Sequence, residues 1–152
     1  MDHETCVEIE SDADMVAARA AGRALAERLG FSRTDGTLIA TAISEVARNI
    51  LVHAGCGEIL LHDVHERDRH GIVVVARDCG PGIQSVELAL QDGWGSSGGL
   101  GLGLPGARRL MDEFTIESVP GDGTTVTMKK WRARDPLERL RREREQREQV
   151  WA

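Results

Sequence analysis

The sequence predicts an α/β (α+β) two-layer sandwich, in which one mixed, mostly antiparallel sheet is covered on one face by helices. The chain has 152 residues, of which 41% are hydrophobic, and this suits one domain with a single core. Segments of alternating apolar and polar residues occur together with segments of helical apolar period. A sharp change of composition after Trp131 separates a domain over residues 1–132 from a charged tail over residues 133–152.

The first two elements follow from hydrophobic period and helix caps. The alternation of Thr5, Val7 and Ile9 with Cys6, Glu8 and Glu10 predicts an amphipathic strand. A cap at Ser11 or Asp12 begins a helix that runs to about Leu29, and Gly30 ends it.

A second helix is predicted from about Thr37 to Ala54, with Gly55 as its end. At about 100° per residue, four large apolar residues share one face of this helix, namely Ile39, Ile43, Val46 and Ile50. Glu45 and Asn49 are four residues apart and share the flank of that face. Two polar groups are therefore directed at the edge of the core.

The rest of the domain alternates strands, turns and two short helices. In chain order, we expect strands at Glu58–Val64 and Gly71–Arg77 joined by the polar turn His65–His70, a helix over Val86–Gln91, a helix from Leu104–Pro105 through Phe114, and a hairpin of Thr115–Val119 and Thr124–Trp131 that turns at Pro120–Gly123.

Composition and charge exclude several classes of protein. The net charge of −6 and the pI of about 5.4 provide no basic surface field for nucleic acid. No run approaches the ~18 apolar residues of a membrane span, and the N-terminus lacks the pattern of a secretory signal. Three cysteines without paired spacing favour a reducing compartment. We therefore expect a cytoplasmic protein with no nucleic-acid or membrane partner.

Three motifs carry the chemistry that we infer. The Asn49 amide oxygen is a suitable hard ligand for Mg²⁺, and the Glu45 carboxylate, one turn earlier, can orient a nucleophile and accept its proton. Asp78 ends a predicted central strand and precedes a turn with Gly80 and Gly82. A carboxylate there can accept a hydrogen bond from a donor such as the amino group of adenine. The glycines let a base approach the backbone closely.

The third motif is the glycine-leucine stretch from Ser96 to Gly106, which leads into a helix. Successive glycines allow backbone N–H groups to turn inward around an anion, and the start of a helix adds further donors. Pro105 suits the first helical turn. The stretch lacks the Gly-Lys-Ser/Thr of a Walker loop and the preceding strand of a Rossmann turn. We interpret it as a phosphate-binding loop.

The order and spacing of these motifs resemble the GHKL superfamily of ATPases and kinases, whose Bergerat ATP-binding fold this implies. The resemblance extends from Thr5 to Trp131. It implies that ATP and Mg²⁺ are the cofactors, that Asn49 holds Mg²⁺, and that Glu45 is the catalytic base. The residues that it implies in binding ATP are Asn49, Asp78, Gly80, Gly82, Ile83, Gly98, Gly99, Leu100, Gly101, Leu102, Gly103, Leu104 and Thr124. The connection from Ile83 to Gly95 would form the ATP lid.

Within that superfamily the chain is similar to the RsbT-type serine/threonine kinases of the bacterial stressosome. The segments that carry this similarity are Val16–Arg19, Ala42–Ile50, Asp92–Leu100 and Gly103–Phe114. The similarity implies a kinase that phosphorylates STAS-domain proteins and is sequestered by them. Once released, it would bind and activate a PP2C-type phosphatase of the stress pathway.

Three alternatives remain open from the sequence. The chain could be an anti-sigma factor kinase that binds a sigma factor, a nucleotide-dependent binding switch with little catalysis, or an ATPase that phosphorylates no protein. The tail departs from the RsbT-type pattern, because Pro136–Gln149 is mostly Arg and Glu. Its i,i+4 charge pairs predict a solvated helix.

Overall fold

The computed structural model describes residues 4–81, 103–133, 144–145 and 147–148. Its elements are β1 (Thr5–Ile9), α1 (Asp12–Arg28), α2 (Arg33–His53), β2 (Gly57–Glu66), β3 (Arg69–Asp78), α4 (Gly103–Leu110), β4 (Glu113–Val119) and β5 (Gly123–Trp131). The predicted helix at residues 86–91 and the predicted lid lie outside the described residues, as do residues 134–143 of the tail.

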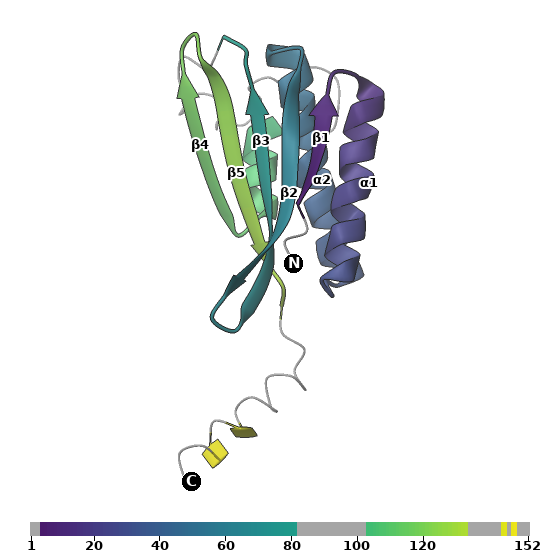
Figure 1. Ribbon diagram of the computed structural model, residues 1–152, viewed down its shortest axis with the longest axis vertical. Coiled ribbons are helices and arrows are strands. Elements are labelled where there is room, and N and C mark those ends of the chain that lie inside the picture. The colour runs from purple at the N-terminus through teal and green to yellow at the C-terminus, as the bar shows by residue number, and fades with distance from the viewer. Residues whose placement is uncertain (1–3, 82–102, 134–143, 146, 149–152) are drawn as a thin grey trace.

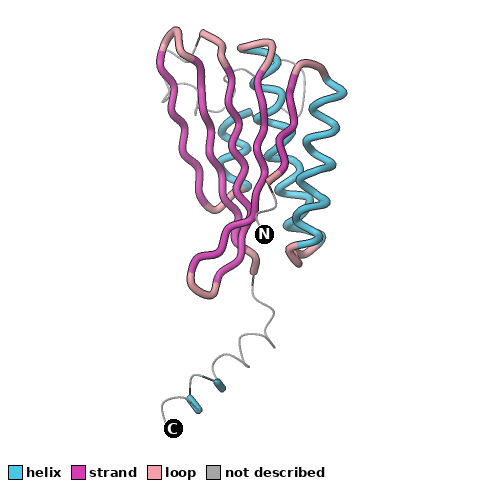
Figure 2. The backbone as a smooth tube through the Cα atoms, in the orientation of Figure 1, coloured by secondary structure: helices cyan, strands magenta, loops and turns pink. Residues whose placement is uncertain are grey.

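The five strands form one sheet in the order β1-β2-β3-β5-β4. All four pairings between described strands are antiparallel, and the described part of the chain contains no parallel pair. The three described helices lie on one face of this sheet, as Figures 1 and 2 show. The predicted two-layer α/β sandwich is therefore confirmed.

Helix α2 lies at the centre of the helical layer and packs against α1, α4 and the sheet. Its predicted apolar face is fully buried, and the core around it is formed mainly by aliphatic side chains from every layer of the fold, among them Ile9, Leu25, Ile39, Ile43, Val46, Ile50, Ile59, Leu61, Ile72, Val74, Leu104, Val126 and Met128. Burial of this apolar surface is the main force that holds the two layers together.

Two predicted helix boundaries were wrong. Helix α2 begins at Arg33, four residues before the predicted Thr37, because the Ser32 hydroxyl accepts a hydrogen bond from the Asp35 N–H (3.1 Å) and caps the helix. Helix α4 ends at Leu110, four residues before the predicted Phe114. Phe114 lies instead in β4, where it pairs with Met128 and faces the core.

The hairpin of β2 and β3 is longer than predicted, because its strands include the charged residues that we assigned to the turn. Only Arg67 and Asp68 form the turn, and Arg67 has a positive φ of 56°. Figure 2 shows this hairpin extending beyond the rest of the sheet. Water can therefore solvate the charged side chains of this hairpin. An ion pair between Arg69 and Glu66 (3.0 Å) also joins the two strands across the turn.

The turn between β4 and β5 is also one residue shorter than predicted. Gly123 belongs to β5, with a positive φ of 99°, and it pairs with Val119. Gly121 has a similar φ of 89°, and its N–H donates to the Pro81 carbonyl oxygen (2.7 Å). Among the described residues, no helix is long and apolar enough to cross a lipid bilayer.

The two turn glycines give a matched test of backbone crowding. A Cβ at Gly123 would overlap the carbonyl oxygen of Asp78, whereas a Cβ at Gly121 meets no atom within 4 Å. We expect Gly121→Ala to lower the free energy of unfolding by about 1 kcal/mol, which is the cost of its backbone conformation. Gly123→Ala should cost at least about 2 kcal/mol more, because backbone atoms must also move. Equal losses in urea denaturation would contradict this.

Candidate functional site

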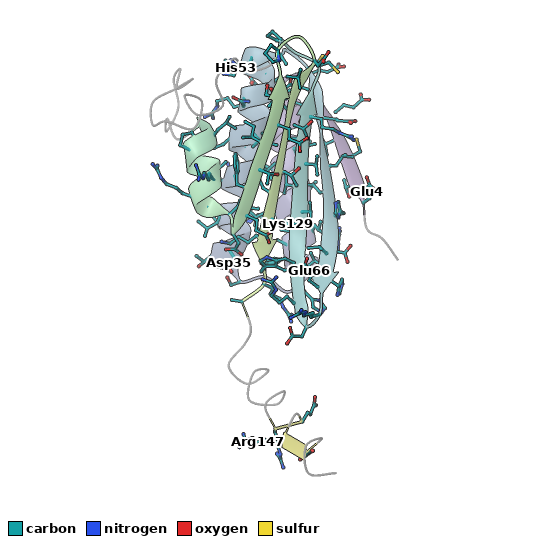
Figure 3. All side chains as sticks on the ribbon, turned by 90° about the vertical axis from the view of Figure 1, so that its left-hand side faces the viewer. Glu4, Asp35, His53, Glu66, Lys129 and Arg147 are labelled. Atoms are coloured by element: carbon teal, nitrogen blue, oxygen red, sulfur yellow. The ribbon has the colours of Figure 1, made fainter. Side chains whose placement is uncertain are left out.

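The polar residues of the first two motifs meet at one end of the molecule. Asp78 is the last residue of β3, Thr124 is the second residue of β5, and α2 ends at His53. Figure 1 shows these three element ends on the same side of the fold, and Figure 3 labels His53 there. The fold thus brings together residues that are far apart in the sequence.

One oxygen of Asp78 fixes the geometry of this end. Asp78 Oδ1 accepts hydrogen bonds from the Gly80 N–H (3.0 Å) and from the Thr124 N–H (3.2 Å). The second bond joins the end of β3 to the start of β5. Within the described part of the chain, Oδ2 has no hydrogen-bond partner. The carboxylate is half-buried and held in place, with one oxygen left for a ligand.

The turn after Asp78 packs directly on the end of α2. A Cβ at Gly80 would lie 2.6 Å from the Cβ of Ala54, the residue that caps the helix. Only glycine permits this approach, since real Cβ atoms do not come so close. The contact fixes the distance between the carboxylate of Asp78 and the last turns of α2, where Asn49 lies.

Thr124 is 5% exposed, and its hydroxyl lies 2.9 Å from the hydroxyl of Ser118 on β4. Its backbone N–H also donates to Asp78. Sequence reasoning missed Ser118. The predicted turn at residues 120–123 would have put Ser118 out of register with Thr124, whereas the observed register pairs them.

Glu45 is buried on α2 and is only 6% exposed. Its Oε1 lies 3.6 Å from Nη1 of Arg48, one turn further along the helix. A buried carboxylate is costly unless it is paired, and Arg48 provides this partner at the edge of the core. Sequence reasoning did not single out Arg48, although its i,i+3 spacing from Glu45 is the signal that predicts such a pair.

Asn49 is half-buried, one helical turn after Glu45. Its side chain makes no hydrogen bond to the described part of the chain. An amide at the edge of a core normally finds a partner, so this one is available to a ligand that provides a donor, a cation or water. Its oxygen is a hard donor of the kind that Mg²⁺ takes.

Of the ATP-binding residues predicted in the glycine-leucine stretch, Gly103 and Leu104 are described. Gly103 begins α4 with a positive φ of 52°, and the Leu104 side chain is 1% exposed in the core. Leu104 therefore anchors the start of α4 against α2, and only its backbone could contact a nucleotide. The other predicted residues of this kind lie outside the described residues, namely Gly82, Ile83, Gly98, Gly99, Leu100, Gly101 and Leu102.

Comparison with protein families identifies this arrangement. The model of the family described as "Histidine kinase-like ATPase domain" matches residues 9–130. The chain belongs to the histidine kinase-like ATPase family. This family assignment confirms the predicted GHKL fold and an ATP-binding domain, and it covers every described residue of the site.

Comparison with individual relatives shows which kind of histidine kinase-like ATPase the chain resembles. The chain is 48% identical to "Serine/threonine-protein kinase RsbT" of Bacillus subtilis (strain 168), over 86% of this chain and 98% of that protein. It is 30% identical to "Anti-sigma F factor" of Clostridium novyi (strain NT), over 74% of this chain and 82% of that protein. The prediction of an RsbT-type serine/threonine protein kinase is confirmed.

Solved structures support the same fold. The RsbU and RsbW domains of Rv1364c from Mycobacterium tuberculosis superpose with a TM-score of 0.60 at 21% identity, over 88% of this chain and 33% of that chain. The mycobacterial sensor histidine kinase MprB gives a TM-score of 0.51 at 16% identity, over 87% of this chain and 99% of that chain. At these identities the likeness concerns the fold alone.

The two hydrogen bonds to Asp78 Oδ1 give a test of its structural role. Asp78→Ala leaves the N–H groups of Gly80 and Thr124 without their acceptor, so we expect the free energy of unfolding to fall by about 2 kcal/mol. Asp78→Asn keeps an acceptor oxygen and should cost less than about 1 kcal/mol. Urea denaturation measures both variants, and an equal loss would show that these bonds do not stabilise the turn.

Proposed function

We propose that this kinase transfers the γ-phosphoryl group of ATP to a Ser or Thr hydroxyl of a STAS-domain protein. The observation that carries the proposal is the presence on α2, four residues apart, of a buried carboxylate, Glu45, and an amide with no hydrogen bond to the described residues, Asn49. The anchored carboxylate of Asp78 lies at the end of β3, on the side of the fold where α2 ends. These three side chains differ in charge, in burial and in the atoms that they can offer to a ligand. We therefore assign each of them a different role: binding adenine, holding Mg²⁺ and orienting the substrate hydroxyl.

Asp78 would bind the adenine of ATP. Its free Oδ2 suits the exocyclic amino group of the base, and Gly80 keeps the backbone beside it uncrowded. Thr124 would support the same contact, because it holds the other oxygen of Asp78. An oxygen that accepts no hydrogen bond from the described residues fits the donor edge of a purine.

Asn49 would be the protein ligand of Mg²⁺. The fit rests on its half-buried amide, which has no other hydrogen-bond partner in the described part of the chain. The ion, when bound, would neutralise charge on the phosphates during transfer. Gly98 to Gly103 would surround the same phosphates through backbone N–H groups, as predicted from the sequence.

Glu45 would act on the protein substrate. Its carboxylate would orient the incoming hydroxyl and accept its proton while the new O–P bond forms and the bond to the leaving ADP breaks. Arg48 would act as a positioning residue, because its guanidinium lies 3.6 Å from that carboxylate. Positioning and charge neutralisation supply most of the rate in this class of reaction.

Partner switching is the second part of the proposal. Sequestration by STAS-domain proteins, followed by release to a PP2C-type phosphatase, is implied by the RsbT-type resemblance and supported by the 48% identical relative. A cytoplasmic location agrees with the use of ATP and with three free, exposed cysteines at positions 6, 56 and 79.

Two variants separate the roles of the carboxylates. We expect Asp78→Asn to weaken ATP binding about 10- to 100-fold, since one charge-assisted hydrogen bond is lost. Glu45→Gln should bind ATP normally and transfer radiolabelled phosphate to a STAS-domain protein at least about 100-fold more slowly. Glu117→Gln, on exposed β4, is the matched control and should behave as the unmodified chain. Undiminished transfer in both test variants would overturn the kinase proposal.

A second candidate function is favoured by the anti-sigma F factor relative at 30% identity. In that case the main partner would be a sigma factor, and nucleotide would select between partners with slow or secondary catalysis. Pull-down by the nucleotide-loaded chain decides between the two. We expect capture of a STAS-domain protein or a PP2C-type phosphatase, whereas capture of a sigma factor alone would favour the second candidate.

A further inference from the structure

A pocket lies between the end of α1 and the start of α2, with a volume of about 420 Å³. We call it the α1–α2 pocket, and the residues that line it are Arg23, Glu27, Phe31, Ser32, Arg33 and Gly36. Figure 3 labels Asp35 at this end of α2 and His53 at the other. At 1.5 Å per residue, Gly36 is roughly 20 Å along the helix from Asn49, so the pocket is separate from the nucleotide site.

Arginine dominates the chemistry of the pocket, although the chain as a whole has a net charge of −6. Arg23 donates a hydrogen bond to the Thr37 hydroxyl (3.3 Å), while Arg33 is exposed and forms no ion pair with the described part of the chain. Glu27 is exposed between them and is likewise without an ion pair among those residues. The pocket therefore offers two guanidinium groups to carboxylates, and one carboxylate to a cation.

The pocket also has an apolar floor and open space. Phe31 forms the floor and is 8% exposed. Gly36 lies in the wall, and a Cβ built there would meet no atom within 4 Å. A ligand that fits would combine acidic groups with an apolar side chain of moderate size.

The chain itself leaves the domain beside this pocket. After β5 ends at Trp131, the Arg132 N–H donates to the His70 carbonyl oxygen (2.8 Å). A Cβ at Gly30 would lie 2.9 Å from Nη1 of Arg132, so that side chain rests against the turn directly before Phe31. An extended chain covers about 3.3 Å per residue, and the five residues that follow Ala133 can therefore span roughly 17 Å.

Those residues have the composition that the pocket requires. The sequence from 134 to 140 is Arg-Asp-Pro-Leu-Glu-Arg-Leu. Asp135 and Glu138 are opposite in charge to Arg23 and Arg33, and Leu137 is an apolar counterpart for Phe31. The segment also carries Arg134 and Arg139, which are opposite in charge to Glu27. The family match stops at residue 130, and the alignment with the Bacillus subtilis kinase uses 98% of that protein. The segment therefore lies outside the part of the chain that the family model matches.

We propose that the α1–α2 pocket binds residues 134–140 of the same chain. Asp135 and Glu138 pair with the guanidinium groups of Arg23 and Arg33, and Leu137 covers Phe31. The contact would cover the connection between α1 and α2, including arginines that a protein partner could otherwise use. It is independent of nucleotide chemistry, so its test does not depend on kinase activity.

The test places a thiol in the pocket. In a full-length chain whose three cysteines are replaced by serine, Gly36→Cys adds a side chain where there is open space. We expect thiol-reactive dye to label it about threefold to tenfold faster when Asp135→Arg and Glu138→Arg are also present, because two exposed ion pairs are lost. The matched control, Glu143→Arg with Glu148→Arg, makes the same charge change further along the tail and should leave the rate unchanged.

The second part of the test reverses the charges on both sides of the proposed contact. Arg23→Glu with Arg33→Glu, added to Asp135→Arg and Glu138→Arg, should restore slow labelling. A thiol from Ala13→Cys, at the exposed start of α1, should label at one rate in all of these chains. Equal labelling of the pocket thiol with and without Asp135→Arg and Glu138→Arg would overturn the proposal. Protection that rises with protein concentration would also overturn it, because a second copy would then fill the pocket.

Discussion

The buried face of α2 is the constraint on which the rest of the molecule depends. Ile39, Ile43, Val46 and Ile50 are at most 2% exposed and join the sheet to the other two described helices. Because a helix is rigid over this length, burying one stripe fixes the direction of every other side chain on it. Glu45 is thereby held at the edge of the core, next to Asn49, and cannot be moved without repacking the domain.

The functional end combines this rigid helix with a backbone contact that only glycine allows. Gly80 approaches Ala54 too closely for any side chain, and Gly123 crowds the carbonyl oxygen of Asp78 in the same way. The two glycines therefore serve packing between segments more than turn formation. As a result, the carboxylate of Asp78 is positioned by α2, β3 and β5 together. Its Oδ1 accepts both hydrogen bonds, and its Oδ2 accepts none from the described residues.

The two ends of α2 serve different purposes in this histidine kinase-like ATPase. One end carries the residues proposed for phosphoryl transfer, and the other carries the arginine-lined pocket. The segment proposed to bind the pocket lies beyond the family match, whereas the residues proposed for the nucleotide site lie within it. This separation would let a tail evolve without disturbing catalysis, since the pocket and the site share no side chain.

The sequence by itself determined the class of fold, the type of nearly every described element and the family. These follow from local signals: the helical period of α2, the alternation in β1, the cap at Ser11 and the order of the motifs. Boundaries failed where local signals were weak, as at the polar first turn of α2. Only the tertiary structure decided that Thr124 anchors Asp78, that Gly80 meets Ala54, and that the Leu104 side chain belongs to the core. The reason is physical: these contacts depend on strand register and on the packing of layers between segments far apart in the chain, which no local pattern encodes.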